Sequence, residues 1–147
     1  MDDKQIINSM NKILTLEHGH LGMYRNFRNH QDKEICRTFR RFMDIEIDHI
    51  RKLDQIILNL GGKPSPLAEG GDILGKVFGI AMNFRDDKEL LKTYSSIEKK
   101  SHLGYTNLIK KLEEAGKKEQ FIAEIASANM LEAKLMFLWL DDKLKSI

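Results

Sequence analysis

Apolar residues recur at alternating steps of three and four along most of this chain, the spacing that turns one face of an α-helix toward a partner. One such helix is predicted around residues 39–57. Its inward positions are Ile35, Phe39, Phe42, Glu46, His49, Leu53, Ile56 and Leu60. Two of them are polar, since Glu46 and His49 lie one turn apart on the inward face. Because burying an unpaired carboxylate is unfavourable, this Glu-x-x-His pair suggests metal ligands, although the motif also arises often by chance.

Three further segments show the same spacing, and each also carries a glutamate on its apolar face. Their inward positions are, in chain order, Ile6, Met10, Ile13, Glu17, His20, Tyr24 and Phe27; Leu91, Tyr94, Glu98, Ser101, Tyr105, Leu108 and Leu112; and Phe121, Ile125, Ala128, Glu132, Leu135 and Trp139. In the last segment Glu124 also falls near the apolar face and is an alternative to Glu132. The sequence therefore predicts four long amphipathic helices, each with one inward glutamate.

Residues that start or stop helices separate these segments. Acidic residues suited to helix starts are Asp2 or Asp3, Asp32, and Asp86 with Asp87. The segment 61–71 contains two prolines and two glycine pairs, which cannot continue a helix. Residues 72–84 then predict a short apolar helix that either packs in the core or faces an apolar substrate or a membrane surface. We predict an all-α single domain, 1–147, built as a four-helix bundle with a long crossover that contains a short fifth helix.

Composition and charge exclude several classes of protein. Lys and Arg number 24 against 22 Asp and Glu, and a net charge of +2 spread over helix faces does not indicate a nucleic-acid partner. The single cysteine, Cys36, excludes an internal disulfide framework. No apolar run approaches the roughly 20 residues of a membrane span, and the amino terminus lacks the pattern of a secretion signal. We therefore expect a cytoplasmic protein with at most peripheral membrane contact.

The four inward glutamates carry more weight together than singly. For any one of them, a slightly exposed or misassigned position is the simpler interpretation. Four carboxylates in one core could not all stay ionised without cations, whereas four carboxylates around two divalent ions sum to zero charge. The set therefore favours a metal site in the centre of the bundle.

At this point the sequence resembles a known family. Glu17, Glu46 with His49, Glu98 and Glu132 resemble the ligand set of ferritin-like di-iron carboxylate proteins, in which two helices give one Glu each and two give Glu-x-x-His. Within that superfamily the sequence is most similar to the demethoxyubiquinone hydroxylases, with rubrerythrin-like proteins next. The intervals between the first three glutamates, the proline-containing loop and the glycine-rich crossover also resemble that family. The resemblance covers nearly the whole chain but depends on few residues.

The resemblance implies two iron ions, with manganese or zinc as alternatives, and a role for each ligand. Glu17 and His49 would bind one ion, Glu98 would bind the other, and Glu46 and Glu132 would bridge both. It also implies reaction with dioxygen or peroxide. Tyr105, seven residues after Glu98, would then donate a hydrogen bond or an electron, whereas Tyr24 is more simply a core tyrosine.

One position departs from the family pattern. Leu135 stands where a histidine would follow Glu132, and a leucine cannot bind a metal ion. His102, one turn after Glu98, is the preferred substitute, and His20, one turn after Glu17, is the other. Either histidine can instead be a core or rim residue that pairs with a neighbouring glutamate.

These observations leave three functional hypotheses. The first is an oxidoreductase, hydroxylase or peroxidase-like, which activates dioxygen or peroxide and accepts an apolar, quinone-like substrate. The second is a protein that binds, stores or senses metal without turnover and has a degraded second site, which Leu135 favours. The third is a metal-free helical interaction module. The apolar C-terminal helix is also compatible with a homodimer.

Overall fold

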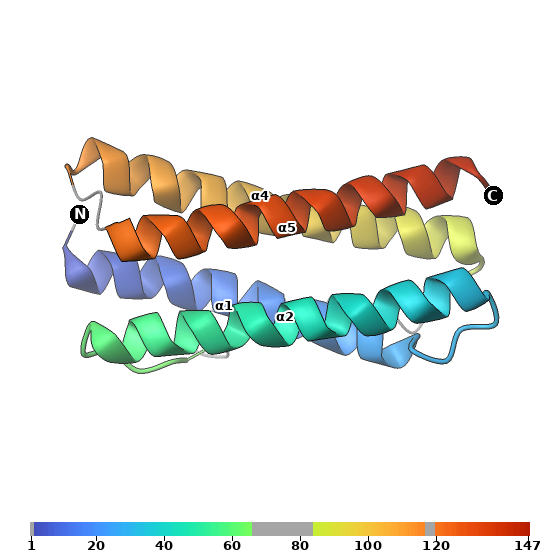
Figure 1. Cartoon of the computed structure of the whole chain (residues 1–147), viewed down its shortest axis with the longest axis horizontal. Coiled ribbons are helices and arrows are strands. Elements are labelled where there is room, and N and C mark those ends of the chain that lie inside the picture. Colours follow the sequence, from blue (N-terminus) through green and yellow to red (C-terminus); the bar gives the residue numbers. More distant parts are fainter. Residues whose placement is uncertain (1, 66–83, 117–119) are drawn as a thin grey trace.

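The computed structural model describes residues 2–65, 84–116 and 120–147. These residues form four long helices and contain no strand. The helices are α1 (Asp3–Asn26), α2 (Lys33–Asn59), α4 (Asp87–Glu114) and α5 (Gln120–Lys145). The predicted all-α four-helix bundle is therefore confirmed (Figure 1). The predicted short helix at 72–84 lies outside the described residues, except for Phe84 at its end.

The helix starts coincide with the acidic residues that the sequence singles out. Asp2 caps α1 and forms a reciprocal capping box with Gln5. Asp32 caps α2, and Asp86 caps α4, each by accepting backbone N–H groups of the first turn. Such caps contribute about 1 kcal/mol each. Gly116 follows α4 at a φ of 69°, a left-handed conformation that glycine adopts without strain.

The connection between α2 and α4 determines the topology. Figure 1 shows that α2 ends at one end of the bundle and α4 begins at the other, so the two helices run parallel. The start of α4 is held beside the α1–α2 turn, where His30 Nε2 lies 2.8 Å from Asp87 Oδ1. Helix α1 packs against α2 and α4, and α5 packs against α4 and α2. No helix in the described part of the chain is long and apolar enough to cross a membrane.

Two apolar clusters fill the bundle, one toward each end. Tyr24, Phe39 and Tyr94 are at the centre of one cluster, and Met10, Leu53 and Leu108 belong to the other. Between them lies a set of buried polar residues that we call the polar layer. Its members are Glu17, His20, Glu46, His49, Glu98, Ser101 and Asn129. Because none is more than 1% exposed, this layer is where burial of polar groups needs an explanation.

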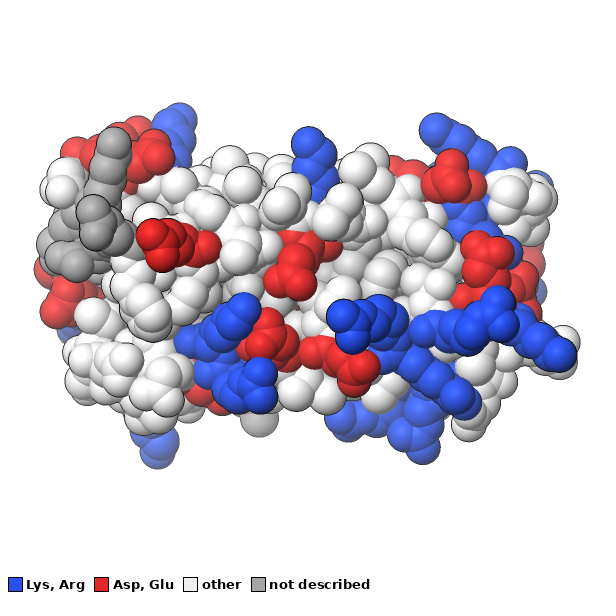
Figure 2. Space-filling view, viewed as in Figure 1, with Lys and Arg blue, Asp and Glu red and all other residues white. Residues whose placement is uncertain are grey.

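The expected register of the last helix is wrong by one position. Phe121 and Leu135, which were expected inside, are both 58% exposed. The residues of α5 that face the core are Ile122, Ala126, Asn129, Ala133, Met136 and Leu140. The error has a physical cause, since α5 carries two adjacent apolar rows with the same spacing and only one can face the bundle. Leu131 and Leu138 are exposed as well, and Figure 2 shows uncharged surface between separate acidic patches along this side of the bundle.

Candidate metal centre

Three helices bring five candidate ligands together in the polar layer. Helix α1 supplies Glu17 and His20, α2 supplies Glu46 and His49, and each pair lies one turn apart on one helix face. Helix α4 adds Glu98. Among the described residues, two groups could each hold a metal ion, because their ligand atoms lie within 4.8 Å of one another. These groups are Glu17, Glu46 and His49, and His20, Glu46 and Glu98. Since Glu46 belongs to both, the arrangement suits two neighbouring ions that share one carboxylate.

Both imidazoles turn the same nitrogen toward the carboxylates. His49 Nδ1 lies 2.6 Å from Glu17 Oε2 and 3.9 Å from Glu46 Oε2. His20 Nδ1 lies 3.4 Å from one oxygen of each of three carboxylates. The three are Glu17, Glu46 and Glu98. A neutral imidazole ligates a metal through an unprotonated nitrogen, and the geometry points to Nδ1 in both rings.

Hydroxyl groups around the centre hold the carboxylates in place. Ser101 Oγ donates to Glu17 Oε1 at 2.8 Å, and the hydroxyl of Tyr105 lies 3.3 Å from Glu17 Oε2 as a second, longer donor. The Tyr24 hydroxyl donates to Glu98 Oε1 at 2.6 Å. Tyr24 is thus a core tyrosine with a bonded hydroxyl, as expected, and its acceptor is a candidate ligand. These bonds leave only some of the carboxylate oxygens free to bind a cation.

Several polar atoms of the layer are buried without a hydrogen-bond partner of normal geometry in the described part of the chain. They are His20 Nε2, both carboxylate oxygens of Glu46, Glu98 Oε2 and Asn129 Oδ1. An unsatisfied buried polar atom costs about 1–3 kcal/mol, and more for a charged group. Three of these atoms are carboxylate oxygens of the two metal groups, so bound cations would remove that cost. The residues therefore fit a metal centre of the carboxylate and histidine type.

The electrostatics of the metal-free centre point the same way. Burial raises the pKa of Glu46 well above its usual value, and the charge of Glu17 raises it further. Burial likewise raises the pKa of Glu98 well above its usual value, although His20 opposes the rise. Burial would also raise the pKa of Glu17, but hydrogen bonds with His20 and His49 outweigh burial and hold this pKa well below its usual value. Without metal, burial thus favours the neutral forms of Glu46 and Glu98, and any proton held there must leave when cations bind.

The histidines and tyrosines complete this picture. Burial tends to lower the pKa of His20, but the charges of Glu98 and Glu17 prevail and raise it. The pKa of His49 is raised as well, because its bonds to Glu17 and Glu132 outweigh burial.

Burial raises the pKa of Tyr24 well above its usual value, with Glu98 adding to the effect. Burial has the same effect on Tyr105, so both phenols stay protonated as hydrogen-bond donors.

The two histidines proposed as substitutes end up in different places. His20 is fully buried in the second metal group. His102 lies outside both groups, half-buried, with its ring 5.6 Å from the ring of Phe137. The reason is helical geometry, because Ser101, three residues after Glu98, takes the inward place that His102 would need.

Helix α5 contributes differently from the expected pattern. Glu132 is 36% exposed and belongs to neither metal group among the described residues; its Oε1 lies 3.1 Å from His49 Nε2. Glu124 is exposed. The residue of α5 inside the polar layer is Asn129, which the sequence analysis missed and whose amide donates to the Tyr105 hydroxyl at 3.2 Å. The signal was present, because in the correct register Asn129 is the one polar interruption of the buried row and Glu132 follows it by three.

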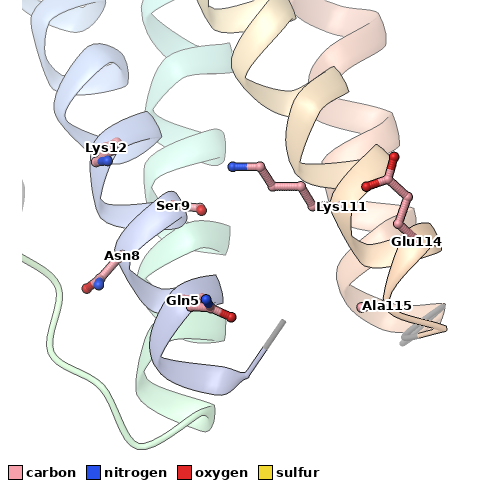
Figure 3. A pocket seen from close by; sticks show the side chains of 7 residues that line it. All are labelled: Gln5, Asn8, Ser9, Lys12, Lys111, Glu114 and Ala115. Atoms are coloured by element: carbon pink, nitrogen blue, oxygen red, sulfur yellow. The ribbon is translucent and has the colours of Figure 1, made fainter.

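Two adjoining hollows on the described surface lie away from this centre. An open groove of about 540 Å³ lies between the first turns of α1 and the last turns of α4, and Figure 3 shows the side chains that line it. Ser9, Lys12 and Lys111 line it and also line an adjoining hollow of about 210 Å³. None of the residues lining either hollow belongs to the polar layer. The buried centre, and not the groove, is therefore the candidate functional site.

The fold and the buried centre define a ferritin-like four-helix bundle. Comparison with solved structures shows this fold directly. The bacterioferritin-related protein of Bacteroides fragilis, described as a dodecameric thioferritin, has a TM-score of 0.80 at 20% identity, over 99% of this chain and 88% of that chain. A ferritin-like, diiron-carboxylate protein of Bacillus anthracis strain Ames has a TM-score of 0.79 at 18% identity, over 98% of this chain and 99% of that chain.

These comparisons confirm the ferritin-like fold and leave finer points as predictions. No family model matches the sequence, and no curated protein matches it significantly. At identities of 20% and 18% the likeness establishes the fold alone. The similarity to demethoxyubiquinone hydroxylases or rubrerythrin-like proteins therefore stays a prediction.

Proposed function

We propose that this protein binds two iron ions in the polar layer and supports their reaction with dioxygen or peroxide. The observation that carries the proposal is that two metal groups share Glu46, both of whose oxygens lack a hydrogen-bond partner of normal geometry in the described chain. One structural neighbour is named as a diiron-carboxylate protein, which supports the choice of iron. Carboxylates with two imidazoles suit iron, manganese or zinc, so the metal itself needs a measurement.

The ligands divide between two ions. Glu17 and His49 would hold the first ion, His20 and Glu98 would hold the second, and Glu46 would lie between them. The centre would then carry three carboxylates, and Glu132 adds a fourth negative charge behind His49. Four carboxylates balance two divalent cations, so the charge argument from the sequence holds although Glu132 does not face the ions.

The residues of the chain would orient the ligands, release protons when cations bind and exclude water from the polar layer. The chemistry that two bound iron ions would supply is the two-electron reduction of dioxygen or peroxide, with both ions oxidised from ferrous to ferric. Tyr24 and Tyr105 keep Glu98 and Glu17 oriented through their hydroxyl groups. We therefore assign Tyr105 to positioning Glu17. The apolar clusters on both sides of the layer exclude water from its ends.

A second function, metal binding without turnover, is favoured by one observation. Asn129 provides a neutral amide at the inward position of α5, where the family pattern has a carboxylate. Carboxylates stabilise the higher charge of oxidised iron, so an amide there makes oxidation less favourable. An apolar quinone-like substrate stays a prediction, because the segment 72–84 that would contribute apolar surface lies almost wholly outside the described residues.

Metal content and oxygen uptake test the proposal together. Protein purified without chelator and loaded anaerobically with ferrous iron is expected to hold two ions per chain. Glu46→Ala is expected to reduce binding at both groups, since Glu46 is shared, whereas Glu124→Ala on the surface of α5 is the matched control. Loaded protein should then consume dioxygen faster than free ferrous iron does. Uptake equal to the protein-free control would support binding without turnover, and an absence of bound metal would contradict both functions.

A further inference from the structure

Glu132 contacts the back of a candidate ligand. Its Oε1 lies 3.1 Å from Nε2 of His49, while Nδ1 of the same ring lies 2.6 Å from Glu17. The imidazole ring thus separates Glu132 from the metal groups. Glu132 is also 36% exposed, whereas the candidate ligands are at most 1% exposed. Both facts argue against Glu132 as a metal ligand.

We propose that Glu132 is a positioning residue. Its carboxylate accepts a hydrogen bond from Nε2–H of His49 and so leaves Nδ1 as the nitrogen that binds metal. The proposal rests on the proposed metal-binding function and assigns a role inside it. A neutral imidazole carries one proton, and the hydrogen bond made by one nitrogen decides which nitrogen is free to ligate. A carboxylate behind a ligating histidine also makes the ring a stronger ligand.

The other imidazole, that of His20, has no described carboxylate at its Nε2. His20 Nε2 is buried and has no hydrogen-bond partner of normal geometry among the described residues; the backbone of Ile97 is a further group that raises the pKa of this ring by hydrogen bonding. Among the residues described, His49 is the one of the two rings with a carboxylate at its far nitrogen. The two metal groups therefore differ in strength, and we infer that the group of Glu17, Glu46 and His49 binds the first ion more tightly than the group of His20 binds the second.

Zinc titration of variants tests the role of Glu132 without relying on activity. Loss of a carboxylate behind a ligating histidine typically lowers affinity by about 10–100-fold. We expect Glu132→Ala to lower the affinity for the first zinc ion by that factor and to leave two ions bound at saturation. Glu132→Gln keeps an oxygen acceptor without the charge, so its affinity should fall between those of Glu132→Ala and the unchanged protein. Glu124→Ala removes an exposed glutamate of the same helix and should change neither step.

The proton position on His49 gives a second readout. In zinc-loaded protein with isotope-labelled histidine, nuclear magnetic resonance should show His49 protonated at Nε2 and bound through Nδ1. Glu132→Gln should keep this form, because the amide oxygen can still accept the proton. Should Glu132→Ala prevent folding, the glutamine variant still tests the affinity.

Three results would overturn the proposal. Equal first-ion affinities for Glu132→Ala and Glu124→Ala would remove any role for Glu132. Loss of one ion in Glu132→Ala, with His49 still bound through Nδ1, would make Glu132 a direct ligand. An unchanged protein that binds no zinc or iron would overturn the proposed function as well, which separates that failure from the first two.

Discussion

The two helix pairs of the bundle contribute unequally to the polar layer. The pair α1 and α2 supplies two Glu-x-x-His motifs, and with them both imidazoles. The pair α4 and α5 supplies one carboxylate, Glu98, and one amide, Asn129, at the same level. Both candidate histidines of the layer thus lie on one helix pair. The other pair provides carboxylate, hydroxyl and amide groups.

The largest expected effect concerns the second imidazole. His20→Ala should lower iron or zinc content from two ions per chain toward one, because His20 lies within the second metal group. His102→Ala should leave the content unchanged, since that ring packs against Phe137 outside both groups. Elemental analysis after anaerobic loading measures the difference. Equal losses in the two variants would show that the helix pairs share the nitrogen ligands after all.

The pH dependence of the metal-free protein should reveal the protonated carboxyl groups. Glu46 and Glu98 have folded-state pKa values well above 4.5, so the folded state keeps protons that the unfolded state releases as pH rises above 4.5. Stability then falls with rising pH, by up to about 1.4 kcal/mol per pH unit for each group. His20 and His49, with pKa values raised from 6.5, act in the same direction above that pH.

Glu17 makes stability fall at low pH instead. Its folded-state pKa lies well below 4.5, so its contribution is lost as pH falls through that lower value. Melting temperatures without metal should therefore peak near pH 4.5 and decline toward neutrality. Bound cations replace the protons, so excess zinc should remove the decline. A metal-free protein whose melting temperature rises from pH 5 to pH 7 would contradict this account.

The register of α5 can be tested by paired substitutions of neighbouring residues. Met136 is 1% exposed and Leu135 is 58% exposed. Met136→Ala should destabilise the protein by about 2–5 kcal/mol through loss of buried packing. Leu135→Ala should stay within about 0.5 kcal/mol, as is usual on a surface. Denaturant unfolding measures both values, and the reverse order would restore the register expected from the sequence.

Met136 and Leu135 also show how far the sequence alone predicts which residues are buried. In α1, α2 and α4 a single apolar row decides which face is buried, so Glu17, Glu46, His49 and Glu98 were placed correctly inside the bundle. In α5 two apolar rows have equal spacing, and the choice depends on the neighbouring helices, which periodicity does not contain. The residue that this choice concealed was Asn129.

Side-chain direction was the other limit. The spacing of His20 and His102 placed either within reach of the centre, and only the packing of Ser101 against Glu17 shows which helix position is truly inward. Similarly, spacing predicts that Glu132 reaches the centre but not that the ring of His49 lies in between. Such contacts depend on the packing of several helices, which the spacing of residues within one helix does not contain.

The smallest expected effect separates two buried tyrosines of the same apolar cluster. The Tyr24 hydroxyl donates to the candidate ligand Glu98 at 2.6 Å, whereas the Tyr94 hydroxyl donates to the backbone carbonyl of Met23 at 3.1 Å. In metal-loaded protein Glu98 is ionised, and a hydrogen bond to a charged group contributes about 1.5–3 kcal/mol against about 0.5–1.5 kcal/mol for a neutral one. Tyr24→Phe should therefore lower the stability of the zinc-loaded protein more than Tyr94→Phe does.

The same comparison without metal decides whether the difference comes from the centre. Burial raises the pKa of Glu98 in the metal-free protein and so favours its neutral form, which accepts a weaker hydrogen bond from Tyr24 than an ionised carboxylate does. The excess cost of Tyr24→Phe over Tyr94→Phe should shrink when zinc is removed, as denaturant unfolding with and without chelator would measure. An excess cost that is equal with and without zinc would mean that Tyr24 supports packing in its cluster and does not orient Glu98. The difference between the helix pairs would then consist only of the two Glu-x-x-His motifs on α1 and α2.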